Sequence, residues 1–342
     1  MNKIKNTLFS NKPVTIDENS LILALESSCD ETACAIVKGG REVLANVVAS
    51  QIKIHEEFGG VIPEIAAREH LEAVNIVVEE AFKQANVKPD NITAFAGTVG
   101  PGLVGCLLVG LNATKSLALA YDKPFIGVNH LIGHISANFI DTNLEPPFIA
   151  LLVSGGHTQI IDVKSYSELE IIGETIDDAV GEAYDKVARL IGLPYPGGPK
   201  LDKLAQLGNP FAFKLPEAKV EGYNFSFSGL KTAVLRLVKS FDGKEMPTND
   251  ICASFQECVS STLLKKVKKA LEEKQYKQVV LAGGVAANSE IRKKIFNLKN
   301  EGYEVFAPQM KYCTDNAAMI ASSAYFFDKT YDNIDVEVFS RL

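Results

Sequence analysis

The chain has 342 residues, of which 46% are hydrophobic and 23% are charged, and its formal net charge is -7 at pH 7. This composition is typical of a globular protein and supplies enough apolar material for two domains. The negative charge argues against a protein that binds nucleic acid by itself, because such proteins usually present a net basic face.

Residues 1–20 are polar and contain no long apolar segment, so they do not resemble a secretory signal. They lack arginine and include Asp17 and Glu18, unlike a mitochondrial transit peptide. We interpret them as a flexible N-terminal extension of a core that begins at Leu21. The six cysteines form no CxxC pair and indicate reduced thiols. The sequence therefore predicts a cytoplasmic protein.

Short apolar segments predict strands at 21–25, 33–37 and 43–48, with the polar turn ESSCDET between the first two. The same plan returns at 148–153, 159–163 and 169–172, with SGGHT (154–158) as the turn. A duplicated strand–turn–strand–strand unit predicts an α/β protein with two similar lobes. We assign the N-terminal lobe to 21–145 and the C-terminal lobe to 146–342, with helical insertions at about 176–275.

Apolar residues at helical spacing predict helices over 64–85, 103–120, 176–191 and 253–275. The stretch 91–114 is uncharged and long enough to suggest a membrane span. Glycines and a proline interrupt it, so we predict a strand, a turn and a helix, and no contact with a membrane.

Three glycine turns each follow a predicted strand: TVGPG (98–102), SGGHT (154–158) and GGVAAN (283–288). Glycine lets the backbone approach a ligand and present its N–H groups, and helix N-termini attract phosphate. Tight turns alone explain any one such motif about half of the time. Three of them in a duplicated chain favour a nucleotide-binding cleft between the lobes.

The segment HLIGH places His130 and His134 four residues apart, where a helix would direct both to one ion. Asp315 in CTDN is a candidate third ligand, although an Asp before a helical segment is more often an N-cap. Two histidines and one carboxylate suit Fe²⁺, and Zn²⁺ accepts the same set. The segment lacks the glutamate of HExxH, so the general base of a peptidase is missing.

Three further residues have both a functional and a structural interpretation. Asp30 in the ESSCDET turn either positions a metal, a water or the nucleophile, or stabilises the turn. Asp185 either holds a ribose hydroxyl or lies on the solvated face of its helix. Lys231 either meets phosphate or tRNA, or is an ordinary surface lysine.

Nine segments resemble the tRNA adenosine threonylcarbamoyltransferases, the TsaD family, and cover residues 21–325 in the expected order. They are ALESSCDETACAIV (24–37), GGVIPEIAAREH (59–70), GPGLVG (100–105), NHLIGHISA (129–137), LLVSGGHTQII (151–161), GETIDDAVGEAYDKVARLIGLPYPGGP (173–199), NFSFSGLKT (224–232), LAGGVAANSEIR (281–292) and CTDNAAMIA (313–321). The resemblance implies an actin-like, hexokinase-like (ASKHA) fold of two RNase H-like lobes. Ala317 departs from the family, which often has glycine after CTDN.

The resemblance also implies a reaction. Threonylcarbamoyl-AMP donates its threonylcarbamoyl group to the exocyclic amine of adenosine 37 in tRNAs that read codons beginning with A, and AMP leaves. One Fe²⁺ per subunit is implied, held by His130, His134 and Asp315. The implied substrate contacts are Val153, Ser154, Gly155, Gly156, His157, Asp185, Gly198 and Asn288. Asp30 or His157 is the candidate acceptor of the amine proton.

Binding of the anticodon loop requires a basic surface. The candidates are Lys265, Lys266, Lys268, Lys269, Arg292, Lys293 and Lys294, although a basic run such as KKVKK is most often a solvated helix face. Because the net charge is negative, we expect protein partners to assist, and the resemblance implies a TsaB-like non-catalytic subunit and a TsaE-like ATPase.

Two alternative functions share this fold. An ATP-dependent small-molecule kinase needs nucleotide-binding turns and a catalytic Asp, but no HxxxH pair. A non-catalytic partner subunit needs neither the metal ligands nor the glycine turns that this chain retains.

Overall fold

The computed structural model describes residues 15–327 and 335–340, so most of the predicted N-terminal extension lies outside the described residues. The chain divides into two compact units, Met1–Leu144 with Asp315–Leu342, and Glu145–Thr314. Each unit contains one five-stranded sheet. Residues 315–342, which the sequence assigns to the second lobe, cluster with unit 1 because the helix that follows Asp315 packs on the first sheet.

The sheet of unit 1 has the order β3-β2-β1-β4-β5. β1, β2 and β3 are antiparallel neighbours, whereas β4 and β5 continue from β1 in parallel. The strands are β1 (Leu21–Glu26), β2 (Glu31–Lys38), β3 (Glu42–Ser50), β4 (Ala94–Gly100) and β5 (Phe125–Asn129). The helices are α1 (Ile52–Phe58), α2 (Pro63–Ala85), α3 (Val104–Ala120), α4 (His130–Ser136) and α10 (Ala317–Phe326), with a 3₁₀ turn η1 at Pro89–Asn91.

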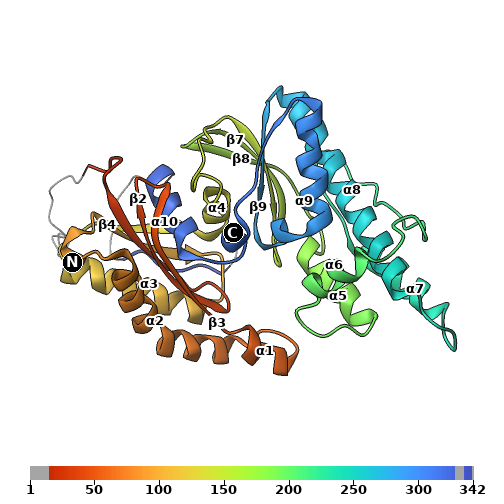
Figure 1. The fold of residues 1–342 in the computed structure, drawn as a ribbon, viewed down its shortest axis with the longest axis horizontal. Coiled ribbons are helices and arrows are strands. Elements are labelled where there is room, and N and C mark those ends of the chain that lie inside the picture. The colour runs from red at the N-terminus through yellow and green to blue at the C-terminus, as the bar shows by residue number, and fades with distance from the viewer. Residues whose placement is uncertain (1–14, 328–334, 341–342) are drawn as a thin grey trace, which may run out of the picture. The chain divides into compact units, whose positions relative to one another are not determined.

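Helices cover this sheet because its central strands have apolar side chains on both faces. α2 and α3 lie side by side (Figure 1), and their apolar residues, among them Val77 and Leu111, share a buried cluster with Leu23 and Leu25 of β1. α10 packs on β1 and β2 and contacts α4. A Cβ on Gly133 of α4 would lie 2.7 Å from the Ile320 side chain of α10, so glycine permits this close approach.

The sheet of unit 2 has the order β8-β7-β6-β9-β10. Its strands are β6 (Phe148–Val153), β7 (Thr158–Ser165), β8 (Glu168–Glu174), β9 (Gln278–Ala282) and β10 (Glu304–Phe306). The helices are α5 (Val180–Leu190), α6 (Gly197–Ala205), α7 (Ser228–Lys239), α8 (Thr248–Lys274) and α9 (Ser289–Phe296). The 3₁₀ turns are η2 (Gly284–Ala287), η3 (Asn297–Glu301) and η4 (Met310–Tyr312). The helices and the sheet share one apolar core.

The two sheets have the same topology, which confirms the predicted duplication. In each, three antiparallel strands are followed by two parallel ones. β6 begins at Phe148, the residue at which the sequence predicts the strand. All six predicted strands in the repeated segments are present, each extended by at most two residues at either end.

Two predicted helices have different starting points. The helix expected from 176 begins at Val180, because Thr175 Oγ1 donates to the Asp178 carbonyl and Val180 N donates to Thr158 Oγ1, which fixes a turn instead. α8 begins at Thr248, before the expected 253. The uncharged stretch 91–114 forms β4, a turn and the first part of α3, as predicted. Within the described residues, no helix is long and apolar enough to cross a membrane.

Candidate functional site

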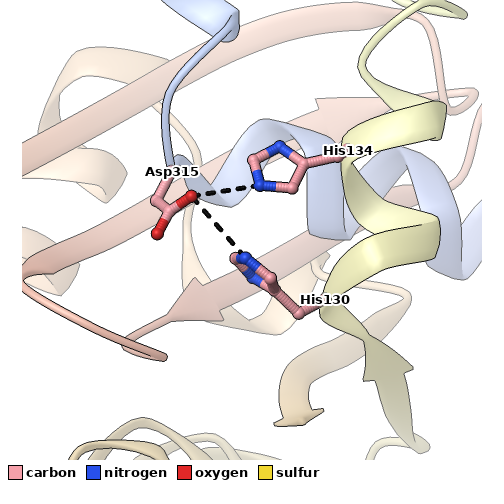
Figure 2. A group of neighbouring side chains, drawn as sticks. All are labelled: His130, His134 and Asp315. Atoms are coloured by element: carbon pink, nitrogen blue, oxygen red, sulfur yellow. Dashed lines mark ion pairs between the residues drawn. The ribbon is translucent and has the colours of Figure 1, made fainter. Parts of the chain in front are cut away.

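The side chains of His130, His134 and Asp315 converge in unit 1 (Figure 2). Asp315 Oδ1 lies 3.2 Å from His134 Nε2 and 3.7 Å from His130 Nε2. One ligand atom from each residue lies within 4.8 Å of the other two. The structure therefore brings together the three residues that the sequence assigned to a metal.

Local structure explains this convergence. Asn129 caps α4, and its Oδ1 accepts from Leu131 N and Ile132 N, so the helix begins at His130 and places both imidazoles on one face. Asp315 immediately precedes α10. Contacts between α4 and α10 bring the loop that carries Asp315 close to the histidines.

The N-cap interpretation of Asp315 is wrong. The N-cap of α10 is Asn316, whose Oδ1 accepts from Met319 N at 3.1 Å. The carboxylate of Asp315 is directed to the histidines instead. Ala317, where the chain departs from the family pattern, is the buried first residue of α10.

The chemistry of the three groups fits a cation. The two Nε2 atoms face the same carboxylate oxygen, and a neutral imidazole can offer a lone pair there. Two imidazole nitrogens and a carboxylate oxygen are a common ligand set for Fe²⁺ and Zn²⁺. The cluster could therefore bind a metal ion.

Charge–charge interactions dominate the acid–base properties of the metal-free cluster. Burial lowers the pKa of His130, but the carboxylates of Glu26 and Asp315 outweigh burial and raise it to about 9. Burial raises the pKa of Asp315, but His130 and His134 outweigh it and lower that pKa to about 2. Without metal, a protonated His130 therefore lies between the carboxylates of Asp315 and Glu26.

Glu26 is a functional candidate that the sequence analysis missed. It is fully buried, and its Oε2 lies 3.1 Å from His130 Nδ1. Ser28 N donates to Oε1 at 2.5 Å, and Thr98 Oγ1 donates to Oε2 at 2.6 Å. The available signal was an acidic residue at the end of the apolar strand LILALE, because carboxylates are rarely buried without partners.

Asp30 lies in the same unit as the metal cluster and is buried. Its main chain is fixed by Gln51 N, which donates to the Asp30 carbonyl at 3.0 Å. Burial, together with the charges of Asp315 and Asp30, raises the pKa of the neighbouring Glu31 to about 9. His70 fixes the same turn, with Nε2 3.0 Å from the Cys29 carbonyl oxygen.

All of the expected substrate contacts belong to unit 2. Val153 ends β6, and the turn that follows is closed by Ser154 N donating to the His157 carbonyl at 2.8 Å. His157 N donates to Ser154 Oγ at 3.1 Å. Gly155 and Gly156 are exposed, and a Cβ at either would meet no heavy atom within 4 Å. The turn therefore has room for a ligand against its backbone.

The other expected contacts form two groups. Asp185 Oδ1 accepts from Gly197 N at 2.9 Å and from Gly198 N at 3.0 Å, at the start of α6. Asn288 caps α9 through Ile291 N, and its Nδ2 donates to Gln256 Oε1 at 2.9 Å. Asp185 is therefore not simply a solvated helix residue, and Asn288 is buried.

The side chains of the predicted basic surface form ion pairs and hydrogen bonds with other residues of the chain. Lys265 pairs with Glu217, Lys268 with Glu301, Lys293 with Glu290 and Lys294 with Glu257. Lys266 donates to two carbonyl groups, and Lys269 pairs with Glu273. Arg292 donates to the carbonyls of Ala286 and Pro308. Each of these residues therefore has a partner within the fold, and the role of this surface in binding tRNA stays a prediction.

Solved structures establish the fold. Full-length HypF in the phosphate- and nucleotide-bound form gives a TM-score of 0.62 at 17% identity, covering 94% of this chain and 47% of that one. HypF from T. kodakarensis gives 0.63 at 15% identity, with 92% and 48% covered, so this chain spans about half of either protein. The fold is the expected actin-like, hexokinase-like fold of two lobes.

Sequence relatives cover nearly the whole chain. A tRNA N6-adenosine threonylcarbamoyltransferase of Clostridium perfringens is 55% identical over 312 residues, which are 90% of this chain and 92% of the relative. The Clostridium botulinum enzyme of the same name is 54% identical over 315 residues, with 90% and 93% covered. The family model for TsaD, tRNA N6-adenosine threonylcarbamoyltransferase, matches residues 42–322. The chain belongs to the TsaD family and is a tRNA N6-adenosine threonylcarbamoyltransferase.

Proposed function

We propose that the chain uses threonylcarbamoyl-AMP as the donor and modifies adenosine 37 of tRNAs that read codons beginning with A. A bond forms between the exocyclic nitrogen and the carbamoyl carbon, and the bond from that carbon to the AMP phosphate oxygen breaks. AMP leaves with the bonding electrons, and the amine proton passes to a base. The convergence of His130, His134 and Asp315 is the observation that carries this proposal.

One Fe²⁺ per subunit would be held by His130, His134 and Asp315, with Zn²⁺ as the second candidate. When bound, the ion supplies Lewis acidity that makes the carbamoyl carbon more electrophilic. This matters because an aromatic exocyclic amine is a poor nucleophile. Metal analysis of protein purified without added metal would distinguish the two ions.

The glycine turn of residues 153–157 would hold the donor, because its backbone is unobstructed at Gly155 and Gly156. Asp185 of α5 would contact the ribose, and Gly198 at the start of α6 and Asn288 at the start of α9 would contact the donor. These groups would hold the AMP moiety while its bond to the carbamoyl carbon breaks.

Asp30 and His157 are the two candidates for the proton acceptor, one in each unit. Asp30→Asn and His157→Gln variants, assayed across pH with saturating donor, would distinguish them. The variant that removes the acceptor should lose the acidic limb of the kcat profile, and the other variant should retain it.

TsaB-like and TsaE-like partners would help to bind tRNA. The net charge of -7 and the internal pairing of the lysines on α8 support this proposal. All six cysteines are free thiols, which supports a cytoplasmic location. Tight binding of tRNA by the purified chain alone at physiological salt would argue against the need for partners.

The test of the proposal is the pair of variants His130→Ala and His134→Ala, assayed for bound metal and for modified tRNA with the donor supplied. We expect both to lose metal and to lose at least about 100-fold in transfer rate. Full transfer activity in a metal-free variant would refute the Lewis-acid role.

A further inference from the structure

The turn after α6 exposes two large hydrophobic side chains. Phe211 is 80% exposed and Leu207 is 74% exposed, the two highest values among the large hydrophobic residues in the described part of the chain. They lie four residues apart in unit 2. Single exposed apolar residues are common, but an aromatic ring so fully presented to solvent is suited to a partner.

The backbone of this turn is fixed by hydrogen bonds. Asn209 N donates to Asp250 Oδ1 at 2.8 Å, and Phe211 N donates to Asn209 Oδ1 at 3.0 Å. Phe213 N donates to Ser254 Oγ at 3.1 Å, and the Phe213 ring packs against the core. The turn therefore presents Phe211 on a fixed backbone, so that little conformational entropy is lost when a ligand binds.

Two exposed lysines flank these side chains in the sequence. Lys203 lies in the last turn of α6, four residues before Leu207, and Lys214 lies three residues after Phe211. Neither lysine has an ion pair or hydrogen bond within residues 15–327 and 335–340. The nearby carboxylates of Asp202 and Asp250 accept hydrogen bonds from Ser289 and from Asn209 N, and neither pairs with these lysines. Both ammonium groups are therefore exposed and available to a ligand.

The turn adjoins the proposed donor contacts of the same unit. Gln206 Nε2, next to Leu207, donates to Ser289 Oγ at 3.2 Å. Ser289 directly follows Asn288, and α6 itself begins at the glycines that contact Asp185. The exposed turn therefore lies next to the proposed donor contact at the start of α9.

We propose that Phe211 stacks on an unpaired base of the tRNA anticodon loop while Lys203 and Lys214 contact neighbouring phosphates. Proteins recognise RNA loops by stacking unpaired bases on aromatic side chains, and lysines add salt-dependent affinity. The lysines of α8 and α9 are paired within the fold, whereas these two are not. This inference rests on the proposed function, because the proposed donor contacts are what place Phe211 close to the reaction.

Phe211→Ala and Phe211→Tyr test the stacking, and Ile171→Ala is the matched control, since Ile171 is 46% exposed on β8 of the same unit. Transfer is measured with full-length protein, its co-purified partners and supplied threonylcarbamoyl-AMP. We expect Phe211→Ala to raise the KM for tRNA about tenfold and to leave the KM for the donor unchanged. Phe211→Tyr should restore the KM for tRNA, and Ile171→Ala should not alter it.

Lys203→Ala and Lys214→Ala test the phosphate contacts. Each should reduce the slope of log Kd for an anticodon stem-loop against log salt by about 0.7. An unchanged KM and Kd for tRNA in Phe211→Ala would overturn the proposal. So would loss of a co-purifying protein partner with unchanged tRNA affinity, because the surface would then bind a polypeptide.

A different experimental result would show that the proposed function is wrong. A wild-type chain that makes no modified tRNA from threonylcarbamoyl-AMP refutes the donor proposal. The Kd of an anticodon stem-loop, compared between wild type and Phe211→Ala, still tests the stacking in that case.

Discussion

Glu26 and His130 meet at 3.1 Å, between Oε2 of a fully buried carboxylate and Nδ1 of the imidazole. When His130 is neutral, as a metal ligand must be, the carboxylate at Nδ1 keeps the proton on that nitrogen and leaves the Nε2 lone pair directed to Asp315 and His134. Thr98 and Ser28 donate to the same carboxylate and fix its orientation. Glu26 is therefore a positioning residue for His130.

The first prediction concerns the variant Glu26→Gln. The change keeps the size of the side chain but removes the charge that favours the correct tautomer, so metal affinity should fall about 10- to 100-fold. Titration of metal-stripped protein with Co²⁺ measures this affinity. Asp162→Asn is the control, because Asp162 is a buried carboxylate in unit 2 that pairs with Lys274. Equal losses in the two variants would mean a general loss of stability.

The second prediction is that metal affinity rises with pH. Because the pKa of His130 is raised to about 9 in the metal-free cluster, a metal ion must displace a proton below that pH. The apparent Co²⁺ affinity should rise about tenfold per pH unit between pH 7 and 9 and then level off. Because the pKa of His130 is higher in the folded chain than in the unfolded chain, protonation of His130 stabilises the metal-free fold below pH 6.5. This stabilisation is lost as pH rises to about 9. An affinity independent of pH over this range would contradict the prediction.

The third prediction concerns Glu31, whose pKa is raised to about 9 by burial and by the charges of Asp315 and Asp30. The folded chain binds a proton that the unfolded chain releases above pH 4.5, so this group makes stability fall as pH rises from 4.5 to about 9. Glu31→Gln stays neutral throughout. At pH 8, the free energy of unfolding of metal-free Glu31→Gln should be higher than that of wild type by on the order of 1 kcal/mol, a value reduced for solvent screening. At pH 4.5 the two proteins should have the same free energy of unfolding. Chemical denaturation at both pH values measures this, and a difference independent of pH would refute it.

The sequence predicts local features of this fold well, because apolar periodicity and turn residues act over short distances. The strands of both lobes and the histidine pair on α4 follow from spacing alone. The contact of Asp315 with His134 joins distant parts of the chain. The sequence offered Asp315 as a candidate ligand, but only the family resemblance favoured that role over a helix cap. The cap of α10 shows the same limit, since Asp315 and Asn316 are both good N-cap residues and only the packing of α10 distinguishes them.

The lysines of α8 illustrate why surface chemistry is harder to predict. The run KKVKK indicates a basic helix face, but the carboxylates that pair with Lys265 and Lys268 come from Glu217 and Glu301, far away in the sequence. Net charge in one segment therefore says little about free charge on the surface. Glu26 was missed for a related reason, because its partners Thr98 and His130 become visible only in the folded chain.

The fourth prediction compares two adjacent glycines. Gly283 has φ +89, and a Cβ there would lie 2.3 Å from the Val153 carbonyl oxygen at the end of β6. Gly283→Ala should therefore lower the free energy of unfolding by about 1–3 kcal/mol. Gly284→Ala is the control, because a Cβ at Gly284 meets no heavy atom within 4 Å, and it should change stability by less than about 0.5 kcal/mol. Urea denaturation of both variants checks the prediction, and equal stabilities would contradict it.

The fifth prediction separates a structural from a functional need for glycine in the turn after β6. A Cβ at Gly155 or Gly156 would meet no heavy atom within 4 Å, and neither residue has the left-handed φ that favours glycine. Alanine at either position should leave the unfolding free energy within about 0.5 kcal/mol of wild type. If the donor lies against this backbone, the added methyl group should raise the KM for threonylcarbamoyl-AMP at least about tenfold.

Gly229→Ala is the matched control for both turn variants, since its Cβ also meets no heavy atom within 4 Å and it is not among the proposed donor contacts. It should leave the KM for the donor unchanged. An unchanged donor KM in both Gly155→Ala and Gly156→Ala would remove the turn from the donor site. A loss of stability in either variant would instead mean that the turn needs glycine for its own conformation, which the open space around both residues argues against.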